Sequence, residues 1–245
     1  MTTIAVAGGT GLVGRLVVEG VRRSGAEAVV IARSAGVDLS IGKGLDRALE
    51  GADAVIDVTN IVTQNRRRAT EFFEASTRNL LDAEVRQGVG HHVVLSIVGI
   101  DRVGFGYYRA KLAQEDLVRE GRVAWTILRA TQFHEFAAQM LGGGPVAAVP
   151  SMLSQPVAAQ EVADEVVRLA TSPPAGMAPE IAGPREERVP DMVRRLAAAQ
   201  GRRPLVLTLP LPGATGRGMR QGALLPTSPG PRGTRTFGEW LEGVR

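Results

Sequence analysis

The first 130 residues of the chain alternate short apolar segments with longer ones in which apolar residues recur every three or four positions. A short apolar run is typical of a buried strand, whereas the longer spacing indicates an amphipathic helix. The predicted strands cover residues 2–9, 27–33, 52–59, 91–99 and 123–130. The predicted helices cover residues 11–25, 44–51, 66–88 and 107–121. This alternation predicts βαβ units, and therefore a parallel sheet with helices on both faces.

The pattern becomes irregular after Phe136. Residues 141–159 are rich in glycine and proline and predict loops with one short strand pair. The later segments predict helices at 159–172, 189–201 and 236–244, and strands at 179–183 and 203–211. We therefore expect a nucleotide-binding core in residues 1–135. Residues 136–245 are expected to form a smaller, irregular part that shapes a substrate pocket and packs on the core as one structural domain.

Composition narrows the classes of partner. The chain has 245 residues, of which 44% are hydrophobic and 22% charged, so it has enough apolar side chains for a sizeable core. The formal net charge is only +4 and aromatic residues make up 4%, which argues against a nucleic-acid binder. Because no apolar run approaches the ~20 residues of a membrane span, we expect no membrane partner. The expected protein is cytoplasmic, a monomer or homodimer, and acts on a small-molecule substrate.

A glycine-rich turn follows the first predicted strand. The residues "GGTGLVG" place Gly8, Gly11 and Gly14 at intervals of three, immediately before a helix. Glycines suit a sharp turn, close approach of a pyrophosphate to backbone N–H groups, and tight packing of helix on strand. The start of the helix offers free N–H donors to phosphates. The turn predicts a dinucleotide site that includes Thr10, Leu12 and Val13; the alternative is an ordinary strand–helix turn.

The end of the second predicted strand indicates which dinucleotide is bound. An NAD site places an acid there to accept from the ribose 2′-hydroxyl, whereas this chain has Arg33. A guanidinium suits a 2′-phosphate, and Ser34 adds a hydroxyl donor. NADP(H) is therefore favoured over NAD(H), unless Arg33 points into solvent. Asp38 is predicted either to accept from the adenine amino group or to cap the next turn.

Both tyrosines and one of the two lysines lie in "GFGYYRAK". Residues four apart on a helix share a face, so Tyr107 and Lys111 are expected to meet, with Tyr108 turned away. An adjacent ammonium lowers the pKa of a phenol and makes it useful in proton transfer. Ser96 ends a predicted strand, where ligands bind in parallel sheets, and is expected to hydrogen-bond a substrate carbonyl or the local backbone.

The glycine turn, Ser96 and the Tyr107–Lys111 pair, in this order, resemble the short-chain dehydrogenase/reductase superfamily. The phrase "YYRAKLAQEDLVREGRVAWTILRATQF" resembles its atypical, NmrA-like NAD(P)-binding branch. The resemblance implies a Rossmann-type doubly wound sheet. It also implies that Tyr107 is the acid/base, that Lys111 orients the nicotinamide ribose and that Ser96 positions the carbonyl. The cofactor-lining positions it implies are Thr59, Asn60, Ala130, Thr131 and Phe133.

The chain departs from that family pattern in two places. Residues 33–53 are too few for the usual third strand, which is expected to be reduced or missing around Asp38. The turn after Arg129 reads Ala-Thr where Arg-Pro is common. Both departures weaken any transfer of substrate class from the family.

Three further positions complete the predicted site. His134, Phe136 and Met140 are candidates for the wall of a substrate pocket, although core packing is the alternative for each. The pair His91 and His92 is expected on the surface, and three histidines without clustered acids predict no metal site. The predicted function is NADP(H)-dependent hydride transfer to or from a small carbonyl or quinone-like substrate. The alternative, also represented in this branch, is a redox sensor that binds NADP(H) without chemistry.

Overall fold

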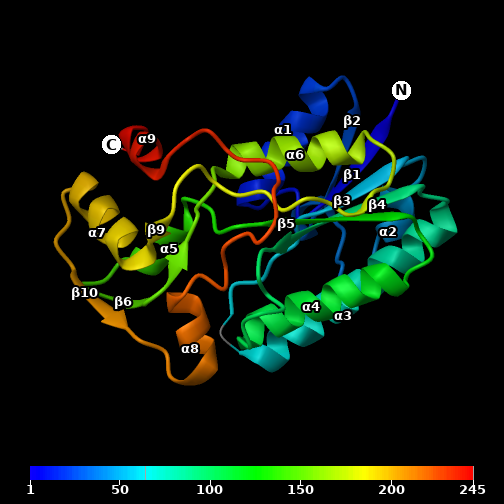
Figure 1. Cartoon of the computed structure of the whole chain (residues 1–245). Coiled ribbons are helices and arrows are strands. Elements are labelled where there is room, and N and C mark those ends of the chain that lie inside the picture. Colours follow the sequence, from blue (N-terminus) through cyan, green and yellow to red (C-terminus); the bar gives the residue numbers. More distant parts are fainter. Residues whose placement is uncertain (64, 245) are drawn as a thin grey trace. The chain divides into compact units, whose positions relative to one another are not determined.

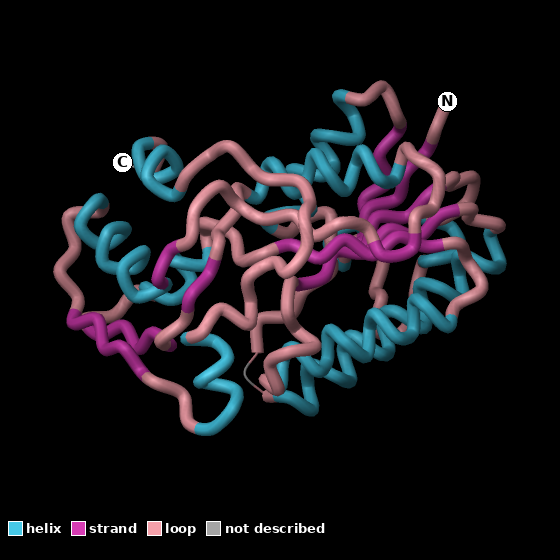
Figure 2. The backbone as a smooth tube through the Cα atoms, viewed as in Figure 1, coloured by secondary structure: helices cyan, strands magenta, loops and turns pink. Residues whose placement is uncertain are grey.

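The computed structural model describes residues 1–63 and 65–244, which divide into two compact units. The first unit comprises Met1–Ser96, Gly106–Arg129 and Val162–Ala178, and the second comprises Ile97–Phe105, Ala130–Glu161 and Pro179–Arg245. The chain therefore passes between the units several times, and a segment from the predicted C-terminal part belongs to the first unit. Figure 2 shows that strands and long helices dominate the first unit, whereas loops make up much of the second.

The first unit contains a six-stranded sheet in the order β2-β1-β3-β4-β5-β8. Strand β1 pairs in parallel with β2 and β3, β3 with β4, and β5 with β8. The strands are β1 Thr3–Ala7, β2 Glu27–Ile31, β3 Ala54–Asp57, β4 His91–Ile97, β5 Trp125–Ala130 and β8 Gly176–Met177. Strands β1 and β3 are almost wholly buried, as expected for central strands of apolar sequence.

Helices cover both faces of this sheet. They are α1 Leu12–Arg23, α2 Leu45–Ala48, α3 Arg66–Gln87, α4 Gly106–Glu120 and α6 Ala159–Ala170. Helices α3 and α4 pack together on one face, and α1 and α6 lie on the other (Figure 1). Gly20 lets α1 approach α6, since a Cβ there would lie 3.1 Å from Val167. The predicted doubly wound, parallel α/β fold is confirmed.

The sheet ends at β2, where a further strand was expected to be reduced or missing. The segment after β2 forms a short helix, Arg33–Ala35, and a single bridge between Asp38 and Lys43. The Asp38 carboxylate accepts from both the backbone N–H and the hydroxyl of Ser40, which closes the chain into a turn. The resulting local hydrogen bonds replace those that a strand beside β2 would make.

The second unit has two small sheets. Its elements are α5 Phe136–Leu141, β6 Val146–Pro150, β7 Leu153–Ser154, β9 Glu187–Arg188, α7 Val189–Ala199, β10 Leu205–Leu209, α8 Gly213–Arg220 and α9 Phe237–Glu242. Strand β6 pairs in parallel with β10, and β7 pairs antiparallel with β9. The predicted pairing within residues 141–159 is therefore wrong, because each strand finds its partner far along the chain. Residues 179–183 make two isolated bridges, from Ile181 to Ala130 and from Ala182 to Arg232, instead of the predicted strand.

Within the described residues, no helix combines the length and apolar character needed to cross a membrane.

Candidate functional site

The glycine turn between β1 and α1 is packed against backbone on two sides. Gly8 has a φ of 80°, and a Cβ there would lie 3.0 Å from the Val58 carbonyl oxygen and 3.1 Å from the Thr59 nitrogen. A Cβ on Gly14 would lie 2.0 Å from the Gly8 carbonyl oxygen. Only glycine fits either position, since the first needs left-handed backbone and the second leaves no room for a side chain.

The start of α1 is free to bind an anion. Its N-cap, Gly11, has extended backbone and no side chain that could accept from the first turn, and that turn contains no acid. Thr10 and Leu12 are exposed, whereas Val13 is buried on the sheet. Free N–H groups at a helix N-terminus suit phosphate. The glycine spacing predicts a dinucleotide site because it precedes a helix start of this kind.

The loop after β3 lies against this turn. Thr59 is buried, and its backbone N–H donates to the Asp57 carboxylate at 2.8 Å. The Thr59 hydroxyl oxygen is buried without a hydrogen-bond partner among the residues that the structure describes. Buried polar atoms are rarely left unpaired, so this hydroxyl is suited to a ligand beside Gly8.

The predicted 2′-phosphate and adenine residues lie at the end of β2. Arg33 and Ser34 are exposed on the short helix that follows the strand. The two hydrogen bonds from Ser40 hold the pKa of the Asp38 carboxyl below its usual value, with smaller effects from the charges of Arg33 and Lys43. Asp38 therefore makes the turn interaction that was one of its two predicted roles; its contact with adenine stays a prediction.

Tyr107 lies at the start of α4, where its hydroxyl donates to the Asn60 Oδ1 atom at 2.6 Å. The ring is half-buried and meets Phe73 edge-on, with centroids 5.8 Å apart. Burial raises the pKa of the phenol above its usual value, with a smaller contribution from Tyr108. Helical spacing led us to expect the opposite shift.

The Lys111 ammonium explains that difference, because it is turned inward. It donates to the Leu95 carbonyl oxygen at 2.7 Å and to the Gln114 side-chain oxygen, and it lies 5.0 Å from the centroid of Phe73. Burial lowers the pKa of Lys111 to about 8, opposed by the charges of Asp57 and Glu115. The expected lowering of the Tyr107 pKa by Lys111 is thus corrected: the lysine stem carries its charge into the core.

Ser96 also has a partner within the first unit. Its hydroxyl donates to the Glu115 carboxylate at 2.5 Å, and the side chain is buried. The same carboxylate accepts from Arg129 Nε at 2.9 Å and Nη2 at 2.8 Å. Neither the substrate contact nor the backbone bond weighed from the sequence describes this arrangement. The sequence analysis did not predict a role for Glu115, whose carboxylate is the common acceptor of Ser96 and Arg129.

Of the residues predicted near the nicotinamide and substrate, six belong to the end of β5 and the second unit. Thr131 is buried and donates to the Gln155 carbonyl oxygen at 2.6 Å, Ala130 is buried, and Phe133 bridges to Val157. Phe136 and Met140 are half-buried on α5. Their predicted contacts with cofactor and substrate stay predictions.

His134 lies in the core of the second unit. It is fully buried, its Nε2 atom is 3.0 Å from the Arg235 carbonyl oxygen, and its ring contacts Phe237 and Trp240. Burial lowers the pKa of the imidazole. This placement matches the packing alternative and does not support a position in a pocket wall.

The two histidines expected on the surface are buried, which corrects that prediction. His91 Nε2 is 2.8 Å from the Thr126 hydroxyl, and His92 Nδ1 is 2.7 Å from the Glu84 carboxylate. Both partners compensate the burial of an imidazole. No group of three or more His, Asp and Glu residues suited to a metal occurs in the described part of the chain.

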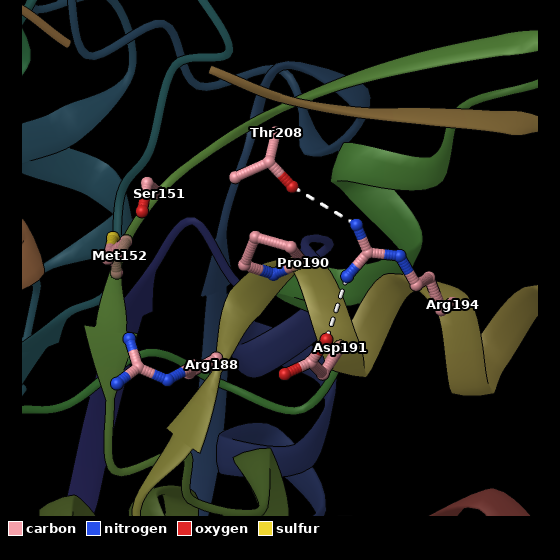
Figure 3. Close-up of a pocket in the computed structure, with 7 residues that line it drawn as sticks. All are labelled: Ser151, Met152, Arg188, Pro190, Asp191, Arg194 and Thr208. Carbon is pink, nitrogen blue, oxygen red and sulfur yellow. Dashed lines mark hydrogen bonds and ion pairs between the residues drawn. The ribbon is translucent and has the colours of Figure 1, made fainter. Parts of the chain in front are cut away.

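A cavity of about 130 Å³ lies in the second unit, between β7, β9, β10 and the start of α7 (Figure 3). Its lining residues are Ser151, Met152, Arg188, Pro190, Asp191, Arg194 and Thr208. Arg194 is held by Asp191 at 2.7 Å and by Thr208 at 3.1 Å. None of the predicted pocket residues lines it, and its volume is below that of a typical small-molecule site.

Comparison with known proteins places these features in a family. Residues 8–173 match a family model described as NAD(P)H-binding. No curated protein sequence matches the chain.

Similar solved structures include a short-chain dehydrogenase/reductase superfamily protein from Agrobacterium tumefaciens with bound NAD. It has a TM-score of 0.73 and 19% identity, covering 99% of this chain and 95% of the other. An NADPH-dependent quinone oxidoreductase of Escherichia coli in complex with NADPH has a TM-score of 0.70 and 18% identity, covering 98% and 99%. A Thermus thermophilus UDP-glucose 4-epimerase in complex with NAD has a TM-score of 0.69 and 19% identity, covering 100% and 94%.

Proposed function

The chain belongs to the NAD(P)H-binding family, and we propose that it is an NADP(H)-dependent oxidoreductase acting on a small carbonyl or quinone-like substrate. The residues of the first unit fit such a cofactor. The tight backbone turn that only glycine allows at Gly8 and Gly14 lies against Thr59, whose buried hydroxyl has no partner among the described residues and would suit a phosphate oxygen. When bound, the nicotinamide supplies or accepts the hydride.

One series of contacts supports this proposal most directly. Gly8 lies against Val58 and Thr59, the next residue along the chain is Asn60, and the Asn60 side chain holds the Tyr107 hydroxyl at 2.6 Å. The Tyr107 hydroxyl is therefore held by the residue that follows Thr59, which lies against the glycine turn. A proton donor beside a bound dinucleotide is what reduction of a carbonyl requires.

The roles of the chain's own residues follow from these contacts. The N–H groups at the start of α1 and the Thr59 hydroxyl bind phosphate oxygens, and Arg33 binds a 2′-phosphate through its guanidinium. Tyr107, whose raised pKa keeps it protonated at neutral pH, donates its proton to the developing substrate oxygen after leaving Asn60. Lys111 places a compact ammonium on the Leu95 carbonyl and Gln114, where the larger, planar guanidinium of arginine is not equivalent; this explains a lysine in a chain that otherwise uses arginine almost throughout.

The test is a screen of small aldehydes, ketones and quinones that follows NADPH absorbance. With any substrate found, Tyr107→Phe is expected to keep cofactor affinity and to lose roughly 10²-fold or more in kcat, the usual contribution of general acid–base catalysis. Tyr108→Phe is the matched control, since that ring is buried beside it. A fully active Tyr107→Phe variant, or a Tyr108→Phe variant that alone is inactive, would refute the assigned role.

A second candidate function is a redox sensor that binds NADP(H) without turning it over. The raised pKa of Tyr107 and the inward hydrogen bonds of Lys111 favour it, because both make the phenol a weaker acid. The two functions differ in one measurement. A sensor binds NADPH in calorimetry yet oxidises none of it with any compound in the screen.

A further inference from the structure

A hydrogen-bonded group around one buried carboxylate, which we term the Glu115 cluster, consists of Ser96, Glu115, Arg119 and Arg129. Glu115 is fully buried. Its Oε1 atom accepts from Ser96 and from Arg129 Nε, and its Oε2 atom accepts from Arg129 Nη2 at 2.8 Å and Arg119 Nη2 at 2.9 Å. Each carboxylate oxygen thus has two donors. Charge-assisted bonds of this kind, two of them from the fork of one guanidinium, fix a side chain firmly.

The cluster connects three elements of the first unit. Glu115 belongs to α4, Ser96 lies near the end of β4, and Arg129 lies near the end of β5. The carboxylate therefore fixes α4 in register against the carboxyl ends of two strands. Ligands bind at this end of a parallel sheet, so the register of α4 decides where its functional groups lie.

Lys111 is held by the direct neighbours of two cluster residues. Its ammonium donates to the carbonyl oxygen of Leu95, which precedes Ser96, and to the side chain of Gln114, which precedes Glu115. Gln114 in turn donates to Asp57 at 2.9 Å. Any displacement of Ser96 or Glu115 therefore moves an acceptor of the lysine.

The proton of Ser96 is committed to this arrangement. A hydroxyl has one proton to donate, and here the Glu115 carboxylate receives it. A substrate carbonyl is an acceptor and needs that same proton. Ser96 cannot serve both at once.

We propose that Glu115 is a positioning residue for Lys111, and that Ser96 acts through Glu115 instead of contacting the substrate. This inference rests on the proposed function for the role of Lys111. The two charges that face the lysine come from different elements, Asp57 at the end of β3 and Glu115 on α4, and the Phe73 ring of α3 lies 5.0 Å from the ammonium.

The test uses the fact that the chain has only two lysines, Lys43 and Lys111. Lysine labelled with ¹³C at Cε gives one resonance for each in a ¹H–¹³C spectrum, and Lys43→Arg assigns them. The titration needs neither substrate nor cofactor. In Glu115→Gln, the Lys111 pKa is expected to fall below the wild-type value because a facing negative charge is removed.

Glu84→Gln is the matched control. Glu84 is also fully buried in the first unit and hydrogen-bonded, to His92 at 2.7 Å, but its charge is not among those acting on Lys111. This variant is expected to lose stability and leave the Lys111 titration unchanged. A Lys111 titration that is the same in wild type and Glu115→Gln, or that moves equally in both glutamine variants, would overturn the inference.

Turnover separates the two roles of Ser96. Glu115→Gln is expected to lower kcat by roughly 10²-fold, as displacement of a positioned group by about 1 Å does. Ser96→Ala, which removes one of four donors, is expected to lower kcat less than tenfold and to shift the Lys111 resonance. The proposal is refuted if Ser96→Ala lowers kcat by roughly 10²- to 10³-fold and leaves the Lys111 resonance unmoved. That result is expected when a donor to the substrate oxygen is removed.

An alternative variant and the combination of the two measurements keep the result decisive. If Glu115→Gln does not fold, Glu115→Asp keeps the charge but shortens the reach, and the Lys111 resonance is still expected to move. If the resonance responds as expected but no substrate is turned over, the proposed function fails and the hold of Glu115 on Lys111 stands. If substrate is turned over and the resonance does not respond, only the present inference fails.

Discussion

Replacing Gly14 by alanine tests the packing of the glycine turn. In an exposed helix, glycine to alanine stabilises by about 1 kcal/mol, because alanine is the better helix former. In this structure a Cβ at Gly14 would lie 2.0 Å from the Gly8 carbonyl oxygen, 2.7 Å from the Gly9 Cα and 2.8 Å from the Gly8 carbonyl carbon. All three atoms belong to the backbone, so no side chain can rotate away.

The magnitude follows from that overlap. Real Cβ atoms do not come closer than 3.0 Å to such neighbours, so the turn must open by about 1 Å. Overpacking of a tight site destabilises by about 1–3 kcal/mol, and a shift of main chain belongs at the upper end. After the gain in helix propensity is subtracted, Gly14→Ala is expected to lower the free energy of unfolding by about 2 kcal/mol. The same displacement of the turn is expected to cost NADPH binding about 1.4 kcal/mol or more, which corresponds to roughly tenfold or more in affinity.

Gly11→Ala provides the matched control three residues away. Its φ of −73° is open to any residue, and the nearest contact of a Cβ would be 3.3 Å, to the Gly8 carbonyl oxygen. This variant is expected to stay within about 1 kcal/mol of wild type, the usual effect of a weaker N-cap.

Urea unfolding followed by tryptophan fluorescence measures the first unit when Trp240→Phe leaves Trp125 of β5 as the single reporter. Calorimetry with NADPH measures the site. The reasoning is refuted if Gly14→Ala unfolds at the same urea concentration as wild type, or if the two alanine variants bind NADPH equally well.

Three other expectations concern single side chains. Arg33→Asp is expected to weaken NADPH binding by roughly ten- to a hundredfold, the worth of a hydrogen bond to a charged group, and to spare NADH; calorimetry in which wild type binds both cofactors equally would contradict it. Thr59→Val removes a buried hydroxyl that has no described partner, so the free energy of unfolding is expected to hold or rise while NADPH affinity falls; a clear loss of stability would show that the hydroxyl is paired. Lys111→Met tests how stability depends on pH. The folded pKa of Lys111 is about 8 against the ordinary 10.5, so the unfolded chain binds the lysine proton more tightly than the folded chain. The free energy of unfolding of wild type relative to the variant is therefore expected to rise by about 3 kcal/mol as pH increases from 8 to above 10.5. Urea unfolding at several pH values measures this rise, and a difference independent of pH would refute the lowered pKa.

The sheet and helices of the first 130 residues could be predicted because their signals are local. The predicted helix 66–88 corresponds to α3, Arg66–Gln87, and the predicted strand 91–99 to β4, His91–Ile97. Apolar periodicity alone places such elements, and the glycine spacing adds the nucleotide turn. The NAD(P)-binding family that the resemblance implied is confirmed as well.

The second unit was predicted less well, because its contacts are long-range. Strand β6 pairs with β10, whose first residue is nearly sixty positions later, and no local pattern announces that pairing. Helix α8, Gly213–Arg220, was missed because its sequence contains three glycines, which lower helix propensity. Tertiary contacts outweigh propensity in both cases.

The candidate site shows a similar limit at the level of side chains. Helical spacing correctly placed Tyr107 and Lys111 one turn apart, but it could not reveal that the lysine reaches the Leu95 carbonyl in the core. The buried His92 is hydrogen-bonded to Glu84, a residue of α3 whose own spacing gives no sign of a buried polar pair. Sequence patterns give the face of an element, whereas the direction of a long side chain depends on partners elsewhere.

The features of the first unit that lower stability or restrict the sequence lie at the carboxyl ends of its strands. At the carboxyl end of β1 lies a backbone contact that only glycine allows, and after β3 lies the Thr59 hydroxyl, which is buried without a partner among the described residues. Near the end of β4 lie the acceptor of a buried ammonium and the serine bound to a buried carboxylate. Each feature lowers stability or restricts sequence, and a chain selected for stability alone would replace them with apolar packing. Their concentration at the end where parallel sheets bind ligands supports the cofactor site proposed above, and Asn60 holds the Tyr107 hydroxyl at the same end.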